Sequence, residues 1–401
     1  MNSKNVNVVL YSLLRKKGNE LSSPDKDSLS NIIFFAKYKT LNKLGEGSFG
    51  KVYKAIYDDE FFALKMEDLS LQHSLLENEA AVLRYLQGPN IPKFETYGYN
   101  KEHNILVMQL LDKSLDDILT KLKTFSVKTT AMLGYQMINI LKYIHNKHII
   151  HRDVKPDNFV MGRKELNGTL YIIDFGLAKK YRSSRTLKQL PLTKRKSLTG
   201  TARYASIHAL QGYEQSRRDD LESVGYTLMY FLRGNLPWQS IKVKNKEERY
   251  KKILNTKKKI SSKELGEGFP IEFAEILDYF KHLGYTENPD YETCCNKLLD
   301  VLKKEKVKFD YIYDWTTYAN LRDRKKRSSH LKDNKNLSKK NTIHTHNKEE
   351  DDDDESNMKL KIEDIDDTDK QNDSSYSNRA DIDEFDSPGL NPKNEIECCL
   401  T

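Results

Sequence analysis

The chain has 401 residues, a formal net charge of +8 and a hydrophobic fraction of 37%. Its four cysteines form two adjacent pairs that are poorly placed to staple distant loops, which excludes a disulfide scaffold and favours a reducing, intracellular setting. The longest apolar run, residues 32–36, is far shorter than the ~18 residues of a membrane span, and no cleavable leader pattern opens the chain. We therefore expect neither a membrane-spanning nor a secreted protein.

Charge is distributed unevenly along the chain. Residues 1–327 contain 57 Lys/Arg and 39 Asp/Glu, a net charge of +18, whereas residues 328–401 contain 10 and 20, a net charge of −10. A basic body suits nucleic acid, a membrane surface or acidic protein substrates, and composition alone does not choose among them.

The first part of the chain favours short strands. Residues 1–36 mix polar and basic residues without firm periodicity, and we expect a weakly structured extension there. Apolar alternation then predicts strands over residues 41–44, 52–57, 61–67, 94–100 and 105–110. Asp58-Asp59 is the predicted turn between the second and third of these strands, and residues 70–86 suit a helix.

The second part favours helices. Residues 127–148 are the clearest case, because Leu133, Met137, Leu141 and Ile144 form an apolar stripe at helical spacing. Residues 220–233 and 271–283 also read as helices, so that a strand-rich front and a helix-rich back predict two lobes over residues 37–320. Residues 321–401 begin with a basic run and become acidic, with too few apolar residues for a core, and we expect them to be disordered.

A glycine-spaced string, Gly45-Glu46-Gly47-Ser48-Phe49-Gly50-Lys51-Val52, lies between the first two predicted strands. Alone it is as consistent with a tight turn as with a loop whose backbone N–H groups approach phosphate oxygens. The strand after it ends in Ala63-Leu64-Lys65, and Lys65 could lie beside two phosphates if an acidic residue holds it. Glu79 on the next helix is the candidate partner and Glu77 its competitor. Taken singly, Lys65 is read more simply as a lysine at a strand edge.

Two further motifs change that balance. His151-Arg152-Asp153-Val154-Lys155-Pro156-Asp157-Asn158 follows the long helix, and Asp174-Phe175-Gly176 follows a predicted strand at residues 170–173. Phosphoryl transfer from a nucleotide asks a protein for positioning and charge neutralisation. Asp153 would accept the hydrogen bond of the attacking hydroxyl and take its proton, and Lys155 would steady the moving phosphoryl group. Asn158 and Asp174 would hold the metal ions that bridge the phosphates. These residue types in this order point strongly to that chemistry.

With these motifs, residues 38–317 resemble the protein kinase family. Three stretches are similar to the casein kinase 1 family within it: Leu198-Thr199-Gly200-Thr201-Ala202-Arg203-Tyr204-Ala205-Ser206, Glu214-Gln215-Ser216-Arg217-Arg218-Asp219-Asp220-Leu221-Glu222-Ser223 and Leu236-Pro237-Trp238-Gln239. Ser206-Ile207-His208 stands where most kinases have Ala-Pro-Glu and casein kinase 1 enzymes have Ser-Ile-Asn. His208 thus puts the local packing in question, but not the chemistry.

The resemblance implies an α+β, two-lobed protein kinase fold, with a β-rich N-lobe and a helical C-lobe ahead of the disordered acidic C-terminal tail. It also implies ATP and Mg²⁺ as cofactors, Met108 as gatekeeper and the backbone of residues 109–111 as the adenine-binding hinge. The implied catalytic residues are Asp153, Lys155, Lys65 and Glu79, and the implied metal ligands are Asn158 and Asp174. The implied ATP-binding residues are Leu44, Gly45, Glu46, Gly47, Ser48, Phe49, Gly50, Val52, Ala63, Lys65, Met108, Gln109 and Leu111.

The similarity to casein kinase 1 also implies protein substrates with acidic or phosphorylated residues upstream of the target Ser/Thr. The positions that match the anion-binding groups of that family are Lys196, Arg203, Lys242, Lys246 and Arg249. Clustered Lys/Arg favour phosphate and carboxylate through charge-assisted hydrogen bonds. For Lys246 and Arg249 a solvated basic face is an equally good interpretation, whereas Arg203 lies inside a matched motif.

Alternatives from other classes fit less well than a Ser/Thr protein kinase that transfers the γ-phosphate of ATP. A catalytically dead kinase fold that serves as a scaffold typically lacks one of the catalytic or metal-binding residues, and all are present here. Nucleic-acid binding by the basic body lacks a groove-reading motif. Within kinases, the tau-tubulin kinase group is the runner-up. The vaccinia-related group fits worse, because the intact Asp174-Phe175-Gly176 and His151-Arg152-Asp153 are atypical of it.

The acidic tail carries three further candidate residues. Ser356 follows the acidic block at residues 349–355 and is a candidate autophosphorylation site, through which a tethered tail could restrain the basic domain; a solubilising tail is equally consistent. Cys398 and Cys399 are candidate lipidation sites in a loose prenylation pattern whose last residue, Thr401, is atypical.

The remaining expectations concern the other cysteine pair, the oligomeric state and the location of the protein. Cys294 and Cys295 lack partners for zinc, which favours core packing. We expect a monomer in the cytoplasm. The basic run at residues 322–327 suits a nuclear address, and a solvated end of the catalytic domain is at least as good an interpretation. Membrane contact would come only through the modified C-terminal cysteines.

Overall fold

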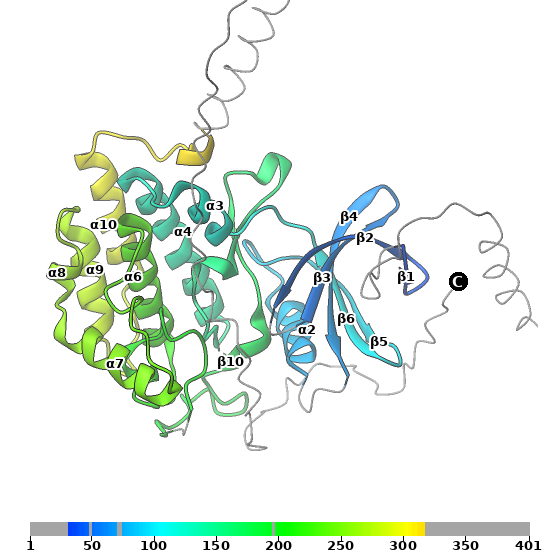
Figure 1. The fold of residues 1–401 in the computed structure, drawn as a ribbon, viewed down its shortest axis with the longest axis horizontal. Helices are drawn as coiled ribbons and strands as arrows, with labels where there is room; N and C mark the ends of the chain where they lie inside the picture. Colours follow the sequence, from blue (N-terminus) through cyan, green and yellow to red (C-terminus); the bar gives the residue numbers. More distant parts are fainter. Residues whose placement is uncertain (1–30, 48–49, 70–73, 195–196, 317–401) are drawn as a thin grey trace, which may run out of the picture. The chain divides into compact units, whose positions relative to one another are not determined.

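The computed structural model describes residues 31–47, 50–69, 74–194 and 197–316. Residues 312–316 belong to a separate unit, and every helix and strand named below precedes them. Strands form the N-terminal part of the described domain and helices form most of the remainder (Figure 1).

The N-lobe is a curled antiparallel sheet of six strands in the order β1-β2-β3-β4-β6-β5. The strands are β1 (Ile33–Phe34), β2 (Tyr38–Gly47), β3 (Gly50–Tyr57), β4 (Glu60–Asp68), β5 (Phe94–Tyr99) and β6 (His103–Gln109). The five strands predicted from alternation are confirmed, and β2 is longer than its predicted range. Asp58 and Asp59 both have positive φ angles, 50° and 60°, as a two-residue hairpin turn requires, and Asp tolerates this conformation.

Period-two alternation gives the sheet one apolar face. Tyr53, Leu64 and Val107 are fully or almost fully buried in a single cluster, because they lie opposite one another on β3, β4 and β6 and opposed residues share a face. Phe34 enters the same cluster from β1 and is 2% exposed. The last residues of the predicted N-terminal extension are therefore part of the sheet, which corrects the expectation of weak structure there. Burying a phenylalanine stabilises the fold by ~1.5–3 kcal/mol, and no periodicity in so short a segment could reveal it.

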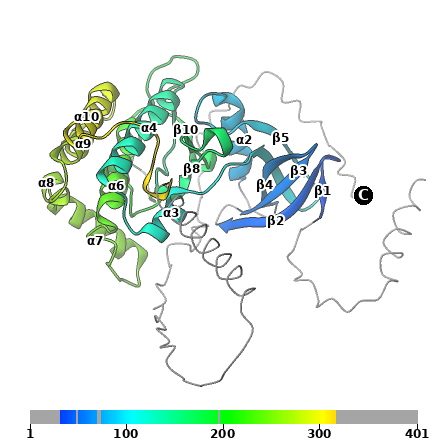
Figure 2. The same cartoon turned by 90° about the horizontal axis from the view of Figure 1, so that it is seen from above.

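One helix, α2 (Leu75–Leu86), packs with the sheet and begins five residues later than the start of its predicted range. Ser74 caps it by accepting a hydrogen bond from the backbone N–H of Glu77, at 3.0 Å. Residues 70–73 lie outside the described residues. Viewed from above, the sheet and α2 form one group and the remaining helices another (Figure 2).

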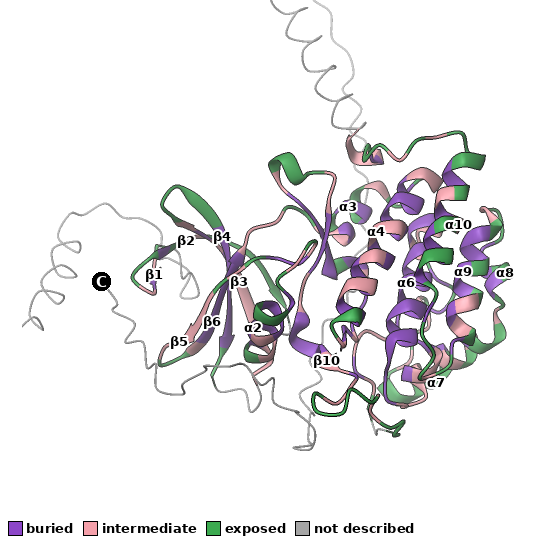
Figure 3. Cartoon of the chain, turned by 180° about the vertical axis from the view of Figure 1, so that it is seen from behind, coloured by how far each residue is buried: buried purple, intermediate pink, exposed green. Residues whose placement is uncertain are grey.

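The C-lobe is helical around α4 (Val127–Asn146) and α6 (Arg217–Arg233), which contact each other and are buried along much of their length (Figure 3). The predicted helices at residues 127–148, 220–233 and 271–283 are confirmed within three residues at each end. The other helices are α3 (Leu115–Leu122), α5 (Ile207–Leu210), α7 (Lys246–Lys259), α8 (Ser262–Leu265), α9 (Ile271–His282) and α10 (Tyr291–Lys304).

Short strands and 3-10 turns carry the loops between these helices. They are β7 (Ile149–Ile150), η2 (Pro156–Asn158), β8 (Phe159–Met161), η3 (Lys164–Leu166), β9 (Leu170–Ile172), η4 (Phe175–Leu177) and β10 (Lys179–Lys180). β7 pairs with β10, and β8 pairs with β9. These pairings bring the two motifs centred on Asp153 and Asp174 to one region of the C-lobe.

Candidate active site

The face of the sheet opposite its apolar core carries residues predicted to contact a nucleotide. Val52 of β3 lies opposite Lys65 of β4, and Ala63 of β4 lies opposite Met108 of β6. Directly opposed residues share a face, as do residues two apart on one strand. Val52, Ala63, Lys65 and Met108 therefore line one surface. The predicted hinge, residues 109–111, begins at the last residue of β6. The next residue, Asp112, donates from its backbone N–H to the carbonyl of Met161, at 2.9 Å, and so joins this segment to the C-lobe.

The turn between β2 and β3 requires glycine at its exit. Gly50 has a φ of +113°, and a Cβ at this position would lie 1.9 Å from the carbonyl oxygen of Met66. Gly45 and Gly47 at the end of β2 have open space where their Cβ atoms would stand, which leaves their backbone accessible to an incoming group.

Other predicted members of the glycine-rich turn lie around these glycines. Leu44 is 48% exposed, and Glu46 forms an ion pair with Lys43. Ser48 and Phe49 lie outside the described residues.

A buried ion-pair cluster links the two lobes. The ammonium Nζ of Lys65 lies 2.7 Å from Oε2 of Glu79 and 3.1 Å from Oδ1 of Asp174. Glu79 is buried, whereas its competitor Glu77 is exposed, so the structure places Glu79 on Lys65.

The ion pairs of this cluster keep Lys65 and Asp174 in their ionised forms. Burial alone would lower the pKa of Lys65, but the carboxylates of Asp174 and Glu79 outweigh it and raise that pKa. Burial would likewise raise the pKa of Asp174, but the ammonium groups of Lys65 and Lys155 lower it. Lys65 and Asp174 are therefore both charged at neutral pH.

The N-terminus of α2, which carries Glu79, is held by a buried carboxylate. Glu67 of β4 is 1% exposed, and its Oε1 accepts hydrogen bonds from the backbone N–H groups of Leu75, at 2.9 Å, and Leu76, at 3.2 Å. Its Oε2 accepts from Ser74 Oγ at 2.5 Å and from Asn104 Nδ2 at 3.3 Å. A carboxylate at this end satisfies N–H groups that have no partner within the helix, so Glu67 fixes where α2 begins.

Asp153 lies at the centre of the second predicted motif and is 5% exposed. Its Oδ1 accepts hydrogen bonds from the backbone N–H of Thr201, at 2.9 Å, and from Thr201 Oγ1, at 2.8 Å. Its Oδ2 lies 2.9 Å from Lys155 Nζ and accepts a longer hydrogen bond, 3.3 Å, from Asn158 Nδ2. The structure thus brings the predicted residues Asp153, Lys155 and Asn158 together and adds Thr201 to them.

Thr201 reaches Asp153 because Gly200 precedes it. Gly200 has a φ of +96°, and a Cβ there would lie 2.3 Å from the carbonyl oxygen of Arg152. Any other residue would push this segment away from Asp153. Lys155 Nζ also lies 3.4 Å from Thr201 Oγ1.

Asp220, on the buried helix α6, holds the backbone of the loop that carries Asp153. Its Oδ2 accepts from the N–H of His151 at 2.7 Å, and its Oδ1 accepts from the N–H of Arg152 at 2.8 Å. His145 Nε2 contacts the same carboxylate at 3.0 Å. Burial would raise the pKa of Asp220, but these hydrogen bonds and the neighbouring histidines lower it, which keeps the carboxylate charged. Arg152 is held with a φ of +68°, a strained value for a non-glycine residue.

Asn158 and Asp174 offer oxygen ligands suited to Mg²⁺. The backbone N–H of Ile173 donates to the carbonyl of Asn158 at 2.9 Å, which places Asp174, the next residue, beside Asn158. Asn158 uses its Nδ2 on Asp153, so its Oδ1 is the atom left for a cation. Within the described ranges, no cluster of three His, Cys, Asp or Glu side chains could hold a metal by itself.

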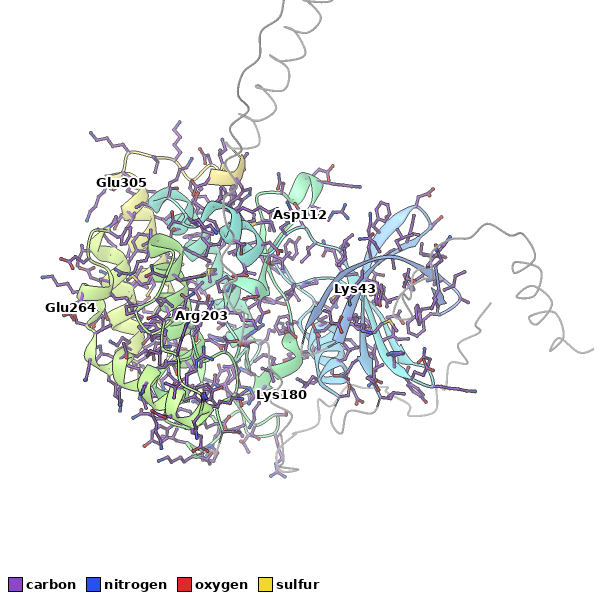
Figure 4. All side chains as sticks on the ribbon, in the orientation of Figure 1. Lys43, Asp112, Lys180, Arg203, Glu264 and Glu305 are labelled. Carbon is purple, nitrogen blue, oxygen red and sulfur yellow. The ribbon has the colours of Figure 1, made fainter. Side chains whose placement is uncertain are left out.

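The predicted anion-binding residues that the structure describes come from two segments of the C-lobe. Arg203 lies in the C-lobe (Figure 4), and its carbonyl accepts a hydrogen bond from Trp238 Nε1 at 2.8 Å. Lys246 and Arg249 lie at the start of α7, and Lys242 is exposed just before it. Lys257, near the end of α7, donates to the carbonyl of Ala205 at 2.5 Å, so this helix contacts the segment that presents Arg203. Lys196 lies outside the described residues.

His208 is accommodated in the short helix α5. Ser206 Oγ donates to Asp219 Oδ1 at 2.5 Å, and the backbone N–H of Ile207 donates to Glu222 Oε1 at 2.9 Å. Burial, together with the nearby cations Arg218 and Lys258, lowers the pKa of His208 to about 4, so its ring is neutral at pH 7. The end of the segment is therefore anchored to α6 by Ser206 and Ile207, which answers the packing question raised by the sequence.

The remaining predictions separate into two groups. Cys294 and Cys295 are buried in α10, as expected for core packing, and burial raises the pKa of both thiols. Ser356, Cys398 and Cys399 lie outside the described residues, and their roles stay predictions. In the part of the chain that the structure describes, no helix has the length and apolar character needed to cross a membrane.

Sequence reasoning missed the roles of Glu67, Thr201 and Asp220. Thr201 and Asp220 act through partners far along the chain, since Thr201 and Asp153 are 48 residues apart and Asp220 and Arg152 are 68 residues apart. Glu67 acts on the start of α2 only eight and nine residues away, but across a stretch of sequence that shows no pattern. No local signal marked Asp220 as buried, because its neighbours Arg218, Asp219 and Glu222 are charged.

The family model of the protein kinase domain matches residues 38–306, about two thirds of the chain. The matched range contains the Lys65–Glu79–Asp174 cluster and the Asp153 loop described above. The chain therefore belongs to the protein kinase family, with the curled N-lobe sheet and helical C-lobe of that fold. It is a phosphotransferase, and the family implies ATP as phosphoryl donor, typically with Mg²⁺. The exact limits of the kinase domain, residues 37 and 320, remain predictions.

Proposed function

We propose that the protein is a Ser/Thr protein kinase of the casein kinase 1 type, which transfers the γ-phosphate of ATP to proteins with acidic or phosphorylated residues upstream of the target. The observation that carries the substrate class is the charge of the segment after Asp174-Phe175-Gly176. Residues 179–196 contain eight Lys/Arg and no Asp/Glu, and Arg203 follows them. Such a segment favours anionic partners through charge-assisted hydrogen bonds.

The arrangement around Asp153 supports transfer to a hydroxyl. Asp153 Oδ1 is occupied by both donors of Thr201, which fixes the orientation of the carboxylate. On Oδ2 the contact with Asn158 is the longest, at 3.3 Å, so an incoming hydroxyl would replace that donor at the least cost. Asp153 then accepts the hydroxyl proton as the oxygen–phosphorus bond forms and the bond from phosphorus to the β-phosphate oxygen breaks, which releases ADP.

The surrounding cations stabilise the negative charge of the phosphoryl group during its transfer. Lys155 lies 2.9 Å from Asp153 and is placed to accompany the phosphoryl group toward the acceptor. Lys65 is held by Glu79 and Asp174 on the nucleotide face of the sheet, where it orients the phosphates. Magnesium ions, held by Asp174 and Asn158 when bound, would offset the negative charge of the phosphate oxygens. Charges that are held in position before the reaction begins are the basis of electrostatic catalysis.

Replacing Arg203 tests the substrate class. We expect Arg203→Gln to lower kcat/KM roughly 10- to 100-fold for a peptide that carries phosphoserine three residues before its target serine, because a hydrogen bond to a charged group contributes ~1.5–3 kcal/mol. The unphosphorylated twin of that peptide should lose much less. Lys263→Gln is the control, because Lys263 is an exposed cation of α8 that lies outside the residues proposed to bind the anion. Equal losses on both peptides would show that Arg203 does not read the anion.

A further inference from the structure

Two side chains of α2 bond the turn at Asp174-Phe175-Gly176: Glu79 accepts from the backbone N–H of Phe175, and the amide of Asn78 reaches three carbonyls. Nδ2 of Asn78 lies 3.2 Å from the carbonyl oxygen of Phe175, 3.0 Å from that of Gly176 and 3.1 Å from that of Ala178. A side-chain amide nitrogen carries two hydrogens, so the three carbonyls share them. Asn78 is the residue before Glu79, and the turn therefore meets α2 beside the Lys65 ion pair.

The backbone of this turn adopts a conformation that contacts with the surrounding residues must stabilise. Asp174 has φ +64° and ψ +70°, the left-handed region that non-glycine residues seldom adopt, and such a conformation persists only where its surroundings impose it. Phe175 is fully buried, and Arg152 Nε donates to the carbonyl of Leu177 at 2.6 Å. The four consecutive carbonyls from residue 175 to 178 thus accept hydrogen bonds from only two side chains among the contacts described, Asn78 and Arg152.

We propose that Asn78 is a positioning residue that fastens the Asp174 turn to α2. It closes a ring of contacts that runs from Lys65 to Glu79, along α2 to Asn78, through the turn to Asp174, and back to Lys65. The ring makes the placement of Asp174 depend on the placement of α2, whose N-terminus Glu67 fixes to the sheet. This inference rests on the proposed role of Asp174 as a metal ligand.

The test compares Asn78→Asp with the wild type in the full-length chain. Aspartate keeps the shape of asparagine but removes both donors and places a carboxylate against three carbonyls. Without nucleotide or metal, hydrogen exchange of the backbone amides of residues 175–180 should become roughly tenfold faster, the effect of losing about one hydrogen bond to a buried group. The affinity for ADP in EDTA should stay within about twofold, whereas the gain in ADP affinity on adding Mg²⁺ should fall roughly tenfold.

Asn139→Asp is the matched control. Asn139 is a partly buried asparagine of α4 that donates to the carbonyl of Tyr135 at 2.9 Å and to Cys295 Sγ at 3.4 Å. It should lower the melting temperature without changing exchange in residues 175–180 or the response to Mg²⁺. If Asn78→Asp does not fold, Asn78→Ala removes the donors without adding a charge and gives the same measurements.

The outcomes separate this inference from the function on which it rests. Unchanged exchange of residues 175–180 in a folded Asn78 variant would overturn the anchoring role. Faster exchange with an unchanged gain from Mg²⁺ would support the anchor and contradict the assignment of Asp174 to the metal. Faster exchange in Asn139→Asp as well would show that the effect is general loosening of the fold, and would overturn the inference.

Discussion

Asp153→Asn should lower kcat for peptide phosphorylation by roughly 10²–10⁴-fold, the usual contribution of a positioned general base. The amide keeps an oxygen that can accept from Thr201, so the loop should stay in place. It cannot accept the proton of the acceptor hydroxyl, and its N–H₂ would face the ammonium of Lys155, now 2.9 Å away. The chemical step should therefore fail while the nucleotide site remains intact.

The measurement is a pair of assays on one preparation. Single-turnover phosphorylation reports the chemical step, and a fluorescent nucleotide titration reports binding, which should change less than about threefold because Asp153 acts on the acceptor rather than on ATP. Asp157→Asn is the matched control, because Asp157 is an exposed aspartate of the same loop. Near-normal turnover in Asp153→Asn would remove Asp153 from its assigned role.

Lys65→Met should affect both activity and stability. We expect kcat/KM for ATP to fall roughly 10²–10³-fold, as for the loss of other preorganised charges that stabilise a transition state. We also expect the free energy of unfolding to fall by ~3–5 kcal/mol, because the substitution leaves the buried Glu79 and the partly buried Asp174 beside each other without their cation.

A double variant separates these two effects. Lys65→Met combined with Glu79→Gln removes the unpaired charge of Glu79 and should recover much of the lost stability, while activity stays low because the phosphates still lack their ammonium. Chemical denaturation and steady-state kinetics on the two single variants and the double variant complete the cycle. If the double variant were no more stable than Lys65→Met, the buried pair would not be the source of the lost stability.

The sequence predicted the regular parts of the fold because their patterns are local. Alternation marked the strands, and the stripe from Leu133 to Ile144 marked α4. It missed α7, which buries only Ile253 and Lys257 and so has no apolar stripe, and it missed α3, whose capping box at Ser114 is a short signal. The two-residue strands β1, β7 and β10 form through their partners, and no window of sequence that short can reveal them.

The candidate site likewise contains residues that local motifs predicted and residues that they did not. Motifs located Lys65, Asp153, Lys155, Asn158 and Asp174, and the structure brings them into two connected clusters. The side chains that hold those clusters in place were not predicted, because Asn78, Thr201 and Asp220 act across 46 to 100 residues of chain. The left-handed backbone of Arg152 and Asp174 also arises from the surrounding contacts rather than from residue type.

The central claim is that this kinase places phosphate on serine or threonine downstream of an anion. The most direct measurement is to incubate the purified full-length chain with ATP, Mg²⁺ and an equimolar set of peptides, and to locate the phosphate by mass spectrometry. The peptides would carry Ser, Thr or Tyr at the target and phosphoserine, Asp or Ala three residues upstream. We expect transfer to Ser and Thr in the order phosphoserine, then Asp, then Ala upstream, and transfer slowed roughly 10²–10⁴-fold in Asp153→Asn. Transfer to Tyr, or equal transfer whatever residue lies upstream, would contradict this claim.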